Sequence, residues 1–118
     1  MDRLPSDITC IFLTVPDDAI VDVVGQLVIS DHLDRKTIVV HTSGALSSSV
    51  LHPLSRQTPL LAAVHPVQTF SGAAEDWKRL MNIYFGVEGN AVALERLNPV
   101  ISSLQGTTVP IPADQKVF

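Results

Sequence analysis

Apolar residues in this chain gather in three uninterrupted runs, and each run ends in a cluster of polar residues. The first run is ITCIFLTV at residues 8–15, the second opens the segment IVVHTSGAL at residues 38–46, and the third is LLAAV at residues 60–64. Consecutive apolar residues without polar alternation are typical of strands covered on both faces, as in a parallel sheet. The carboxyl ends of parallel strands meet at one edge of the sheet, where ligands bind in open α/β folds. The polar residues that follow these runs are therefore the candidate site.

Helical periodicity follows the first of these strands. Asp17 or Asp18 is expected to cap a helix that continues to about Ile29, because a carboxylate there satisfies free backbone amides. A shorter helix is expected from Ser47 to Ser55, and a loop over residues 65–72 is expected after the third strand. The apolar stripe of the long helix comprises Ile20, Val23, Val24, Leu27 and Val28.

The second half of the chain continues the alternation of helices and strands. A helix over residues 74–81 is expected to precede a strand over residues 83–87, and Gly89-Asn90 then turns the chain into a last helix. The apolar stripe of that helix comprises Leu94, Leu97, Ile101 and Leu104.

Gly106 suits the end of the last helix, and prolines bracket the strand expected over residues 107–111. Proline lacks a backbone donor, so this strand belongs at a sheet edge. The alternation of strands and helices predicts an α/β fold, a mostly parallel sheet of about five strands with flanking helices. The first strand is expected to leave one edge unpaired, which favours a homodimer.

Composition narrows the classes of partner. The chain has 118 residues, enough for one domain, and 46% of them are hydrophobic. The net charge is -4 and basic residues do not cluster, so neither nucleic acid nor a membrane is an expected partner. The first residues do not resemble a signal peptide, and Cys10 is the single cysteine. We therefore expect a cytoplasmic protein.

The candidate chemistry lies at the strand ends. His41, Thr42 and Ser43 could bind a ligand through hydrogen bonds, and Gly44 would let a ligand approach the backbone. His65 could donate or accept a proton. Two alternatives remain. Residues 41–44 could form only a strand-to-helix turn, and the ring nitrogens of His65 could be satisfied within its own loop.

Two other kinds of site are disfavoured. Ser43 with His65 would suit a hydrolase, but the serine lies outside a G-x-S-x-G elbow and no acid is placed to orient the histidine. The four histidines show no short ligand spacing, so no metal site is expected. The chain also contains no G-x-G-x-x-G and no P-loop.

The ordered motifs LTVPDDAI, VVHTSGAL, AVHPVQTF, FGVEG and VPIPADQKVF resemble a bacterial family of uncharacterised Rossmann-like proteins. That family is related to the 6-phosphogluconate dehydrogenase-like group, which includes pyrroline-5-carboxylate reductase and prephenate dehydrogenase. Its members have an amino-terminal NAD(P)-binding domain and a carboxyl-terminal helical dimerisation domain. The resemblance covers nearly the whole chain.

The resemblance implies roles for particular residues. Val15, Pro16 and Asp17 match the strand end beside the nicotinamide ribose. The segment His41-Thr42-Ser43-Gly44 matches the strand end near the nicotinamide and the substrate. His65 with its following proline is similar to the His-Pro pair of prephenate dehydrogenases, where the histidine acts on the substrate. Ser43 and His65 are accordingly the candidate catalytic residues, and NAD or NADP is the implied cofactor.

The resemblance also implies that two parts of the family pattern are missing. The glycine-rich βαβ unit would precede the first motif, and the helical domain would follow the last. We therefore expect residues 1–118 to form a single Rossmann-like half-domain from an NAD(P)-dependent oxidoreductase that acts on a small molecule. The alternative is a non-enzymatic truncated module that binds no cofactor and self-associates through residues 8–15.

Overall fold

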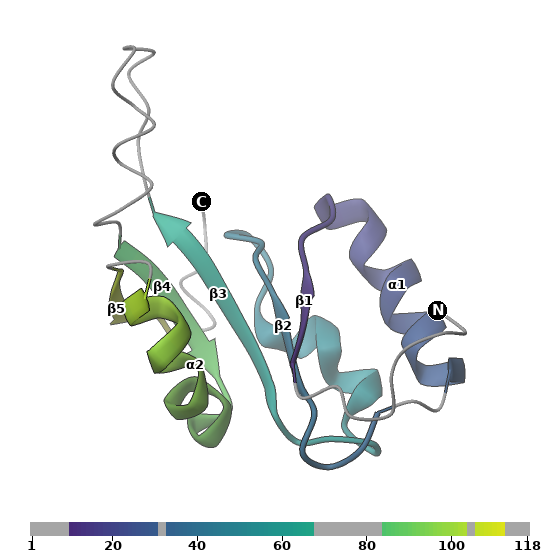
Figure 1. The fold of residues 1–118 in the computed structure, drawn as a ribbon. Coiled ribbons are helices and arrows are strands. Elements are labelled where there is room, and N and C mark those ends of the chain that lie inside the picture. The colour runs from purple at the N-terminus through teal and green to yellow at the C-terminus, as the bar shows by residue number, and fades with distance from the viewer. Residues whose placement is uncertain (1–9, 31–32, 68–83, 104–105, 113–118) are drawn as a thin grey trace.

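The structure is a computed structural model, and it describes residues 10–30, 33–67, 84–103 and 106–112. These residues form one five-stranded sheet in the order β1-β2-β3-β4-β5, with helices on both faces (Figure 1). Three of its four strand pairings are parallel, and β4 runs antiparallel to β3. The predicted α/β fold is confirmed. The strands are β1 Cys10–Leu13, β2 Ile38–His41, β3 Leu61–Val67, β4 Tyr84–Gly89 and β5 Thr107–Pro110.

One face of the sheet is covered by helix α1, Asp17–Ser30, and by η1, Ser48–Leu54. The predicted helix at η1 exists, but it is a 3-10 helix, and the Ser47 side chain accepts a hydrogen bond from Ser49 N at its start. Val28 of the predicted α1 stripe is 39% exposed, because it has turned away from the sheet. The core between these helices and the sheet comprises Ile20, Val24 and Leu27 of α1, Leu33 after it, Leu51 and Leu54 of η1, and Leu13, Val39 and Leu61 of the strands.

The start of α1 differs from the prediction. The carbonyl of Pro16 accepts a hydrogen bond from Ala19 N at 2.9 Å, so Pro16 stands in the capping position. Asp17 and Asp18 lie inside the first turn instead of capping it. Their carboxylates still suit this position, because they lie near the positive end of the helix dipole.

The opposite face is covered over β3, β4 and β5 by helix α2, Ala91–Ser103. Asn90 begins it as predicted, with its side-chain oxygen accepting a hydrogen bond from Ala93 N at 3.0 Å. Leu97 and Ile101 of the predicted stripe are buried, while Leu94 is half-buried and residue 104 lies outside the described residues. This second core also contains Val64 of β3 and Phe85 and Val87 of β4.

The loop predicted from His65 is wrong at its start, because β3 continues to Val67. His65 pairs with Gly86 of β4, and Pro66 pairs with Phe85. Strand β2 stops pairing with β3 at Ala63, so one side of β3 is already open where Pro66 stands. A proline there breaks no ladder on that side, and β4 holds the strand in place. Residues 68–83, which include the predicted helix over 74–81, lie outside the described residues.

Strands β1 and β5 form the two edges of the sheet, as the sequence predicted. Gly89 has a φ of 134°, and a Cβ there would lie 2.6 Å from the Leu61 carbonyl oxygen, so the turn before α2 requires glycine. Among the described residues, no helix is long and apolar enough to cross a bilayer.

Two glycines provide a matched test of the packing. Gly106 N donates to the Ile101 carbonyl at 3.0 Å, and a Cβ on Gly106 would lie 2.6 Å from Cδ2 of Phe85. We expect Gly106→Ala to lower the free energy of unfolding by about 1–3 kcal/mol, because it overpacks this contact.

Gly25, within α1, has open space where a Cβ would be. Gly25→Ala should therefore raise that free energy by roughly 1 kcal/mol. Urea denaturation checks both, and a Gly106→Ala variant as stable as the parent would contradict the packing.

Candidate functional site

The predicted site residues follow two neighbouring parallel strands. Leu13, at the end of β1, is paired with His41, at the end of β2, so the segments after these strands leave the same edge of the sheet. Val15 is half-buried after β1, and Pro16 and Asp17 are exposed. The two segments that the sequence predicts to bind the cofactor therefore leave the sheet from adjacent strands.

His41 holds the turn after β2 together. Its ring is fully buried, and Nε2 lies 2.8 Å from the Ser47 carbonyl oxygen while Nδ1 accepts a hydrogen bond from Ser43 N at 3.1 Å. A carbonyl can only accept, so Nε2 carries the proton and the ring is a neutral tautomer. The His41 side chain therefore bridges both ends of the turn.

Ser43 completes the same turn. Its hydroxyl oxygen accepts hydrogen bonds from Ala45 N and Leu46 N, both at 3.1 Å, and the residue is 8% exposed. A serine oxygen that accepts from amides two and three residues ahead stabilises a local turn. This is the structural role that the sequence left open for Ser43, and its catalytic role stays a prediction.

His65 connects β3 to this turn. Its Nδ1 donates to the carbonyl of Thr42 at 3.0 Å. A Cβ on Gly44 would lie 2.7 Å from Nε2, so the imidazole rests where any other residue would put its side chain. The sequence predicts that a ligand approaches the bare backbone of Gly44, which stays a prediction, and in the structure the imidazole of His65 also needs the space beside it. The structure thus brings together His65, Thr42 and Gly44.

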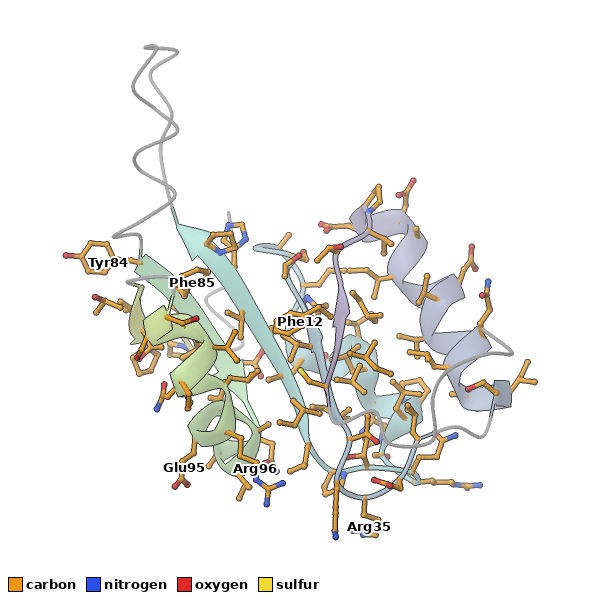
Figure 2. The ribbon with its side chains drawn as sticks, viewed as in Figure 1. Phe12, Arg35, Tyr84, Phe85, Glu95 and Arg96 are labelled. Carbon is orange, nitrogen blue, oxygen red and sulfur yellow. The ribbon has the colours of Figure 1, made fainter. Side chains whose placement is uncertain are left out.

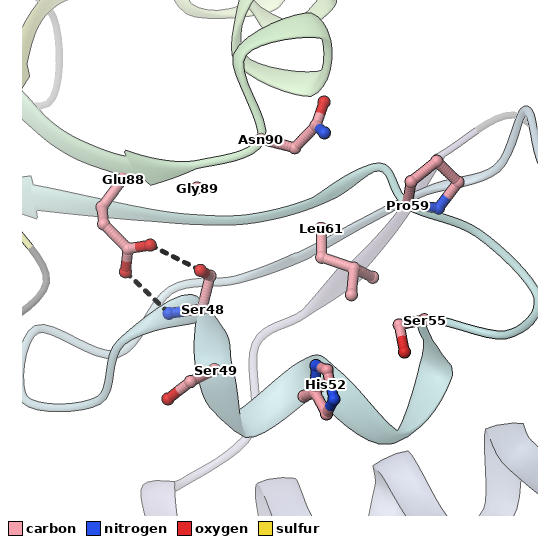
Figure 3. Close-up of a pocket in the computed structure, with 9 residues that line it drawn as sticks. All are labelled: Ser48, Ser49, His52, Ser55, Pro59, Leu61, Glu88, Gly89 and Asn90. Atoms are coloured by element: carbon pink, nitrogen blue, oxygen red, sulfur yellow. Dashed lines mark hydrogen bonds between the residues drawn. The ribbon is translucent and has the colours of Figure 1, made fainter.

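The structure also has a depression that was not foreseen from the sequence. It encloses about 430 Å³ on the η1 side of the sheet, near the start of β3, and none of the predicted site residues lines it (Figure 3). The carboxylate of Glu88 accepts hydrogen bonds there from Ser48 N at 2.7 Å and Ser48 Oγ at 2.5 Å. These residues are 40 positions apart, so no local pattern could have paired them.

A family model for the Rossmann-like domain matches residues 4–66, more than half of the chain. The chain belongs to the Rossmann-like domain family. No curated protein matches it.

Three solved structures are similar to this chain in fold. Protein TM1727 from Thermotoga maritima is 26% identical with a TM-score of 0.67, and the match covers 98% of this chain and 41% of that one. Synechocystis arogenate dehydrogenase is 17% identical with a TM-score of 0.68, over 92% and 40% of the two chains. Prephenate dehydrogenase from A. aeolicus, in complex with hydroxyphenyl propionate and NAD+, is 10% identical with a TM-score of 0.68, over 90% and 39%.

These comparisons confirm the resemblance seen in the sequence motifs, since the Rossmann-like domain has dehydrogenases among its structural neighbours. The two dehydrogenases are too distant in sequence to show more than a shared fold. The chain spans about two fifths of the length of the solved structures that it matches.

The contact between His65 and Gly44 can be tested with a double-mutant cycle. Gly44→Ala should lower the free energy of unfolding by about 1–3 kcal/mol, because the new methyl group displaces the imidazole. In a His65→Ala background the same change should cost less, since the ring that it strikes is gone. Equal costs in both backgrounds, measured by urea denaturation, would show that the two residues are not in contact.

Proposed function

We propose that this domain forms the nicotinamide and substrate side of an NAD(P)-dependent oxidoreductase that transfers a hydride to or from a small molecule. The observation that carries the proposal is the imidazole of His65, which β3 presents to the turn after β2 and which Thr42 and Gly44 hold in one orientation. A fixed proton-transfer group at the carboxyl edge of parallel strands is typical of an α/β enzyme site.

The residues at this edge fit a nicotinamide cofactor by position and by chemistry. Exposed Pro16 and Asp17, with half-buried Val15, follow β1, where the ribose of the cofactor would lie beside them. His41, Thr42, Ser43 and Gly44 follow β2 as a turn that internal hydrogen bonds make rigid. When bound, the cofactor supplies the hydride chemistry, and these residues would hold and orient it.

His65 is suited to move the proton that accompanies hydride transfer. Oxidation of an alcohol releases a hydroxyl proton, and reduction of a carbonyl consumes one. The hydrogen bond from Nδ1 to the Thr42 carbonyl orients the ring, and an imidazole can donate or accept a proton. Ser43 lies in the turn that receives this ring, so we assign it a contact with the substrate or cofactor at the same edge.

The comparisons support the class of reaction. Two of the structural neighbours are dehydrogenases, and one of them holds NAD+. This sequence contains no phosphate-binding glycine motif, so the part of the cofactor that these residues would contact is the nicotinamide half. A cytoplasmic location, as predicted from the sequence, belongs to the same proposal.

Titration calorimetry with NADH and NADPH tests the assignment. We expect the parent chain to bind one of them, and His65→Ala and Ser43→Ala to weaken binding about tenfold or more, a loss of roughly 1.4 kcal/mol. His52→Ala is the matched control, because His52 is exposed on η1 and lines the separate depression beside Ser48 and Glu88. Absence of binding to the parent chain, or equal loss in the control, would reject this site in the isolated domain.

A second candidate function is a non-enzymatic module that self-associates and binds no cofactor. It is favoured by β1, whose outer edge has no strand partner among the described residues, while Phe12 at its centre is 44% exposed. Phe12→Lys should abolish any homodimer that forms along this edge. Sedimentation shows the result, and a dimer that persists in the variant would rule out pairing through β1.

A further inference from the structure

Two hydrogen bonds of the turn after β2 meet at one peptide group. The carbonyl of Thr42 accepts a hydrogen bond from Nδ1 of His65 at 3.0 Å. The amide of Ser43 donates to Nδ1 of His41 at 3.1 Å. This carbonyl and this amide belong to the same trans peptide, in which C=O and N–H point in opposite directions. The peptide between residues 42 and 43 therefore connects the two imidazole rings.

A second peptide group is held in the same way on the other side of His41. Nε2 of His41 donates to the carbonyl of Ser47 at 2.8 Å. The amide of Ser48, in the same planar unit as that carbonyl, donates to the carboxylate of Glu88 at 2.7 Å (Figure 3). His41 and Glu88 thus hold this peptide from opposite sides, and it cannot rotate without breaking one of the two hydrogen bonds.

The four hydrogen bonds all run in one direction, and we call them together the relay. Each begins at an N–H, so the relay passes from His65 through the first peptide to His41, and through the second peptide to Glu88. Hydrogen bonds arranged in a row polarise one another, and more so where the dielectric constant is low, as around the fully buried His41. The last acceptor is a carboxylate, which forms a stronger hydrogen bond than a neutral acceptor.

The register of the sheet explains how β4 reaches a turn that follows β2. His41 is paired with Ala63 of β3, and Ala63 is paired with Glu88 of β4, so the three side chains form one row on the η1 face. The outer two strands of this row are two strand spacings apart, about 10 Å. Ala63 has only a methyl group, which leaves space for the second peptide between the larger side chains on either side.

We propose that Glu88 is a positioning residue for His65 and acts on it through the relay. Its carboxylate fixes the second peptide and, through the ring of His41, the first peptide, whose carbonyl sets the direction of the His65 imidazole. No acid in the sequence is placed to orient this histidine by proximity along the chain, and the relay supplies one from another strand. The inference rests on the proposed function, in which His65 moves a proton.

Three substitutions separate the relay from local packing. Ser48→Pro removes the amide that donates to Glu88 and leaves the carboxylate in place. Proline suits this position, because Ser48 begins η1 and Ser47 before it is extended, with a φ of -80° and a ψ of 173°. Ser48→Ala is the matched control, since it loses only the hydroxyl bond to Glu88 and keeps the amide of the relay. Glu88→Gln removes the charge at nearly constant size, and it decides the test if Ser48→Pro does not fold.

Nitrogen NMR of the imidazole rings, without cofactor, is the measurement, because the shifts of the two ring nitrogens show which of them holds the proton. The spectra are recorded at about pH 8.5, above the ordinary titration range of histidine. We expect the proton of His65 to lie on Nδ1 in the parent chain. Ser48→Pro and Glu88→Gln should both reduce the fraction of Nδ1 that is protonated, while Ser48→Ala should leave it unchanged.

Glu95→Gln is the control for charge. Glu95 is exposed on α2, on the face of the sheet opposite η1 (Figure 2), so this change removes an equal charge and should not alter the His65 signals. Unchanged His65 signals in folded Glu88→Gln would overturn the proposal. A change in Glu88→Gln but not in folded Ser48→Pro would also overturn it, because the charge would then act through space.

The spectra decide about Glu88 separately from the proposed function, since they need no bound nicotinamide. A parent chain that binds neither NADH nor NADPH in calorimetry would contradict the proposed function. The response of the His65 ring to Ser48→Pro and Glu88→Gln would still confirm or reject the relay.

Discussion

Burial of β2 on both faces is the constraint on which the rest of the structure depends. Val39 packs into the core under α1 and η1, and Val40 packs into the core under α2. Both are fully buried, and the strand has no polar face to offer water. A strand held from both sides cannot shift in register without moving apolar residues out of both cores. The turn that leaves it is therefore delivered to a fixed place at the carboxyl edge.

Buried polar groups then give that turn its shape. The ring of His41 lies in the interior, where an imidazole must use its nitrogens, and it satisfies both the amide of Ser43 and the carbonyl of Ser47. Because the turn is closed in this way, the carbonyl of Thr42 points to a place where His65 can bind it. The candidate site is thus an assembly in which one histidine shapes the turn and a second histidine is held by it.

The same layered design leaves surface to be covered. Helices α1 and η1 lie over one half of one face, and α2 lies over the other half of the opposite face. Each helix buries the apolar residues beneath it, but no element among the described residues lies over β1 and β2 beside α2.

The sequence by itself determined the elements whose causes are local. The uninterrupted apolar runs predicted the first three strands, although only β2 and the apolar part of β3 are buried on both faces, while Phe12 of β1 is 44% exposed. Periodic stripes predicted α1 and α2, Asn90 predicted a helix start, and the final prolines predicted an edge strand. Three features were decided by tertiary structure alone. His65 and Pro66 belong to a strand because β4, about twenty residues later, pairs with them.

Gly44 is required by a ring that arrives from another strand, and Ser48 binds a carboxylate 40 residues away. In each case the deciding group is distant in sequence. Local propensity and periodicity therefore contain no information about that group, and only the assembled sheet brings the partners into contact.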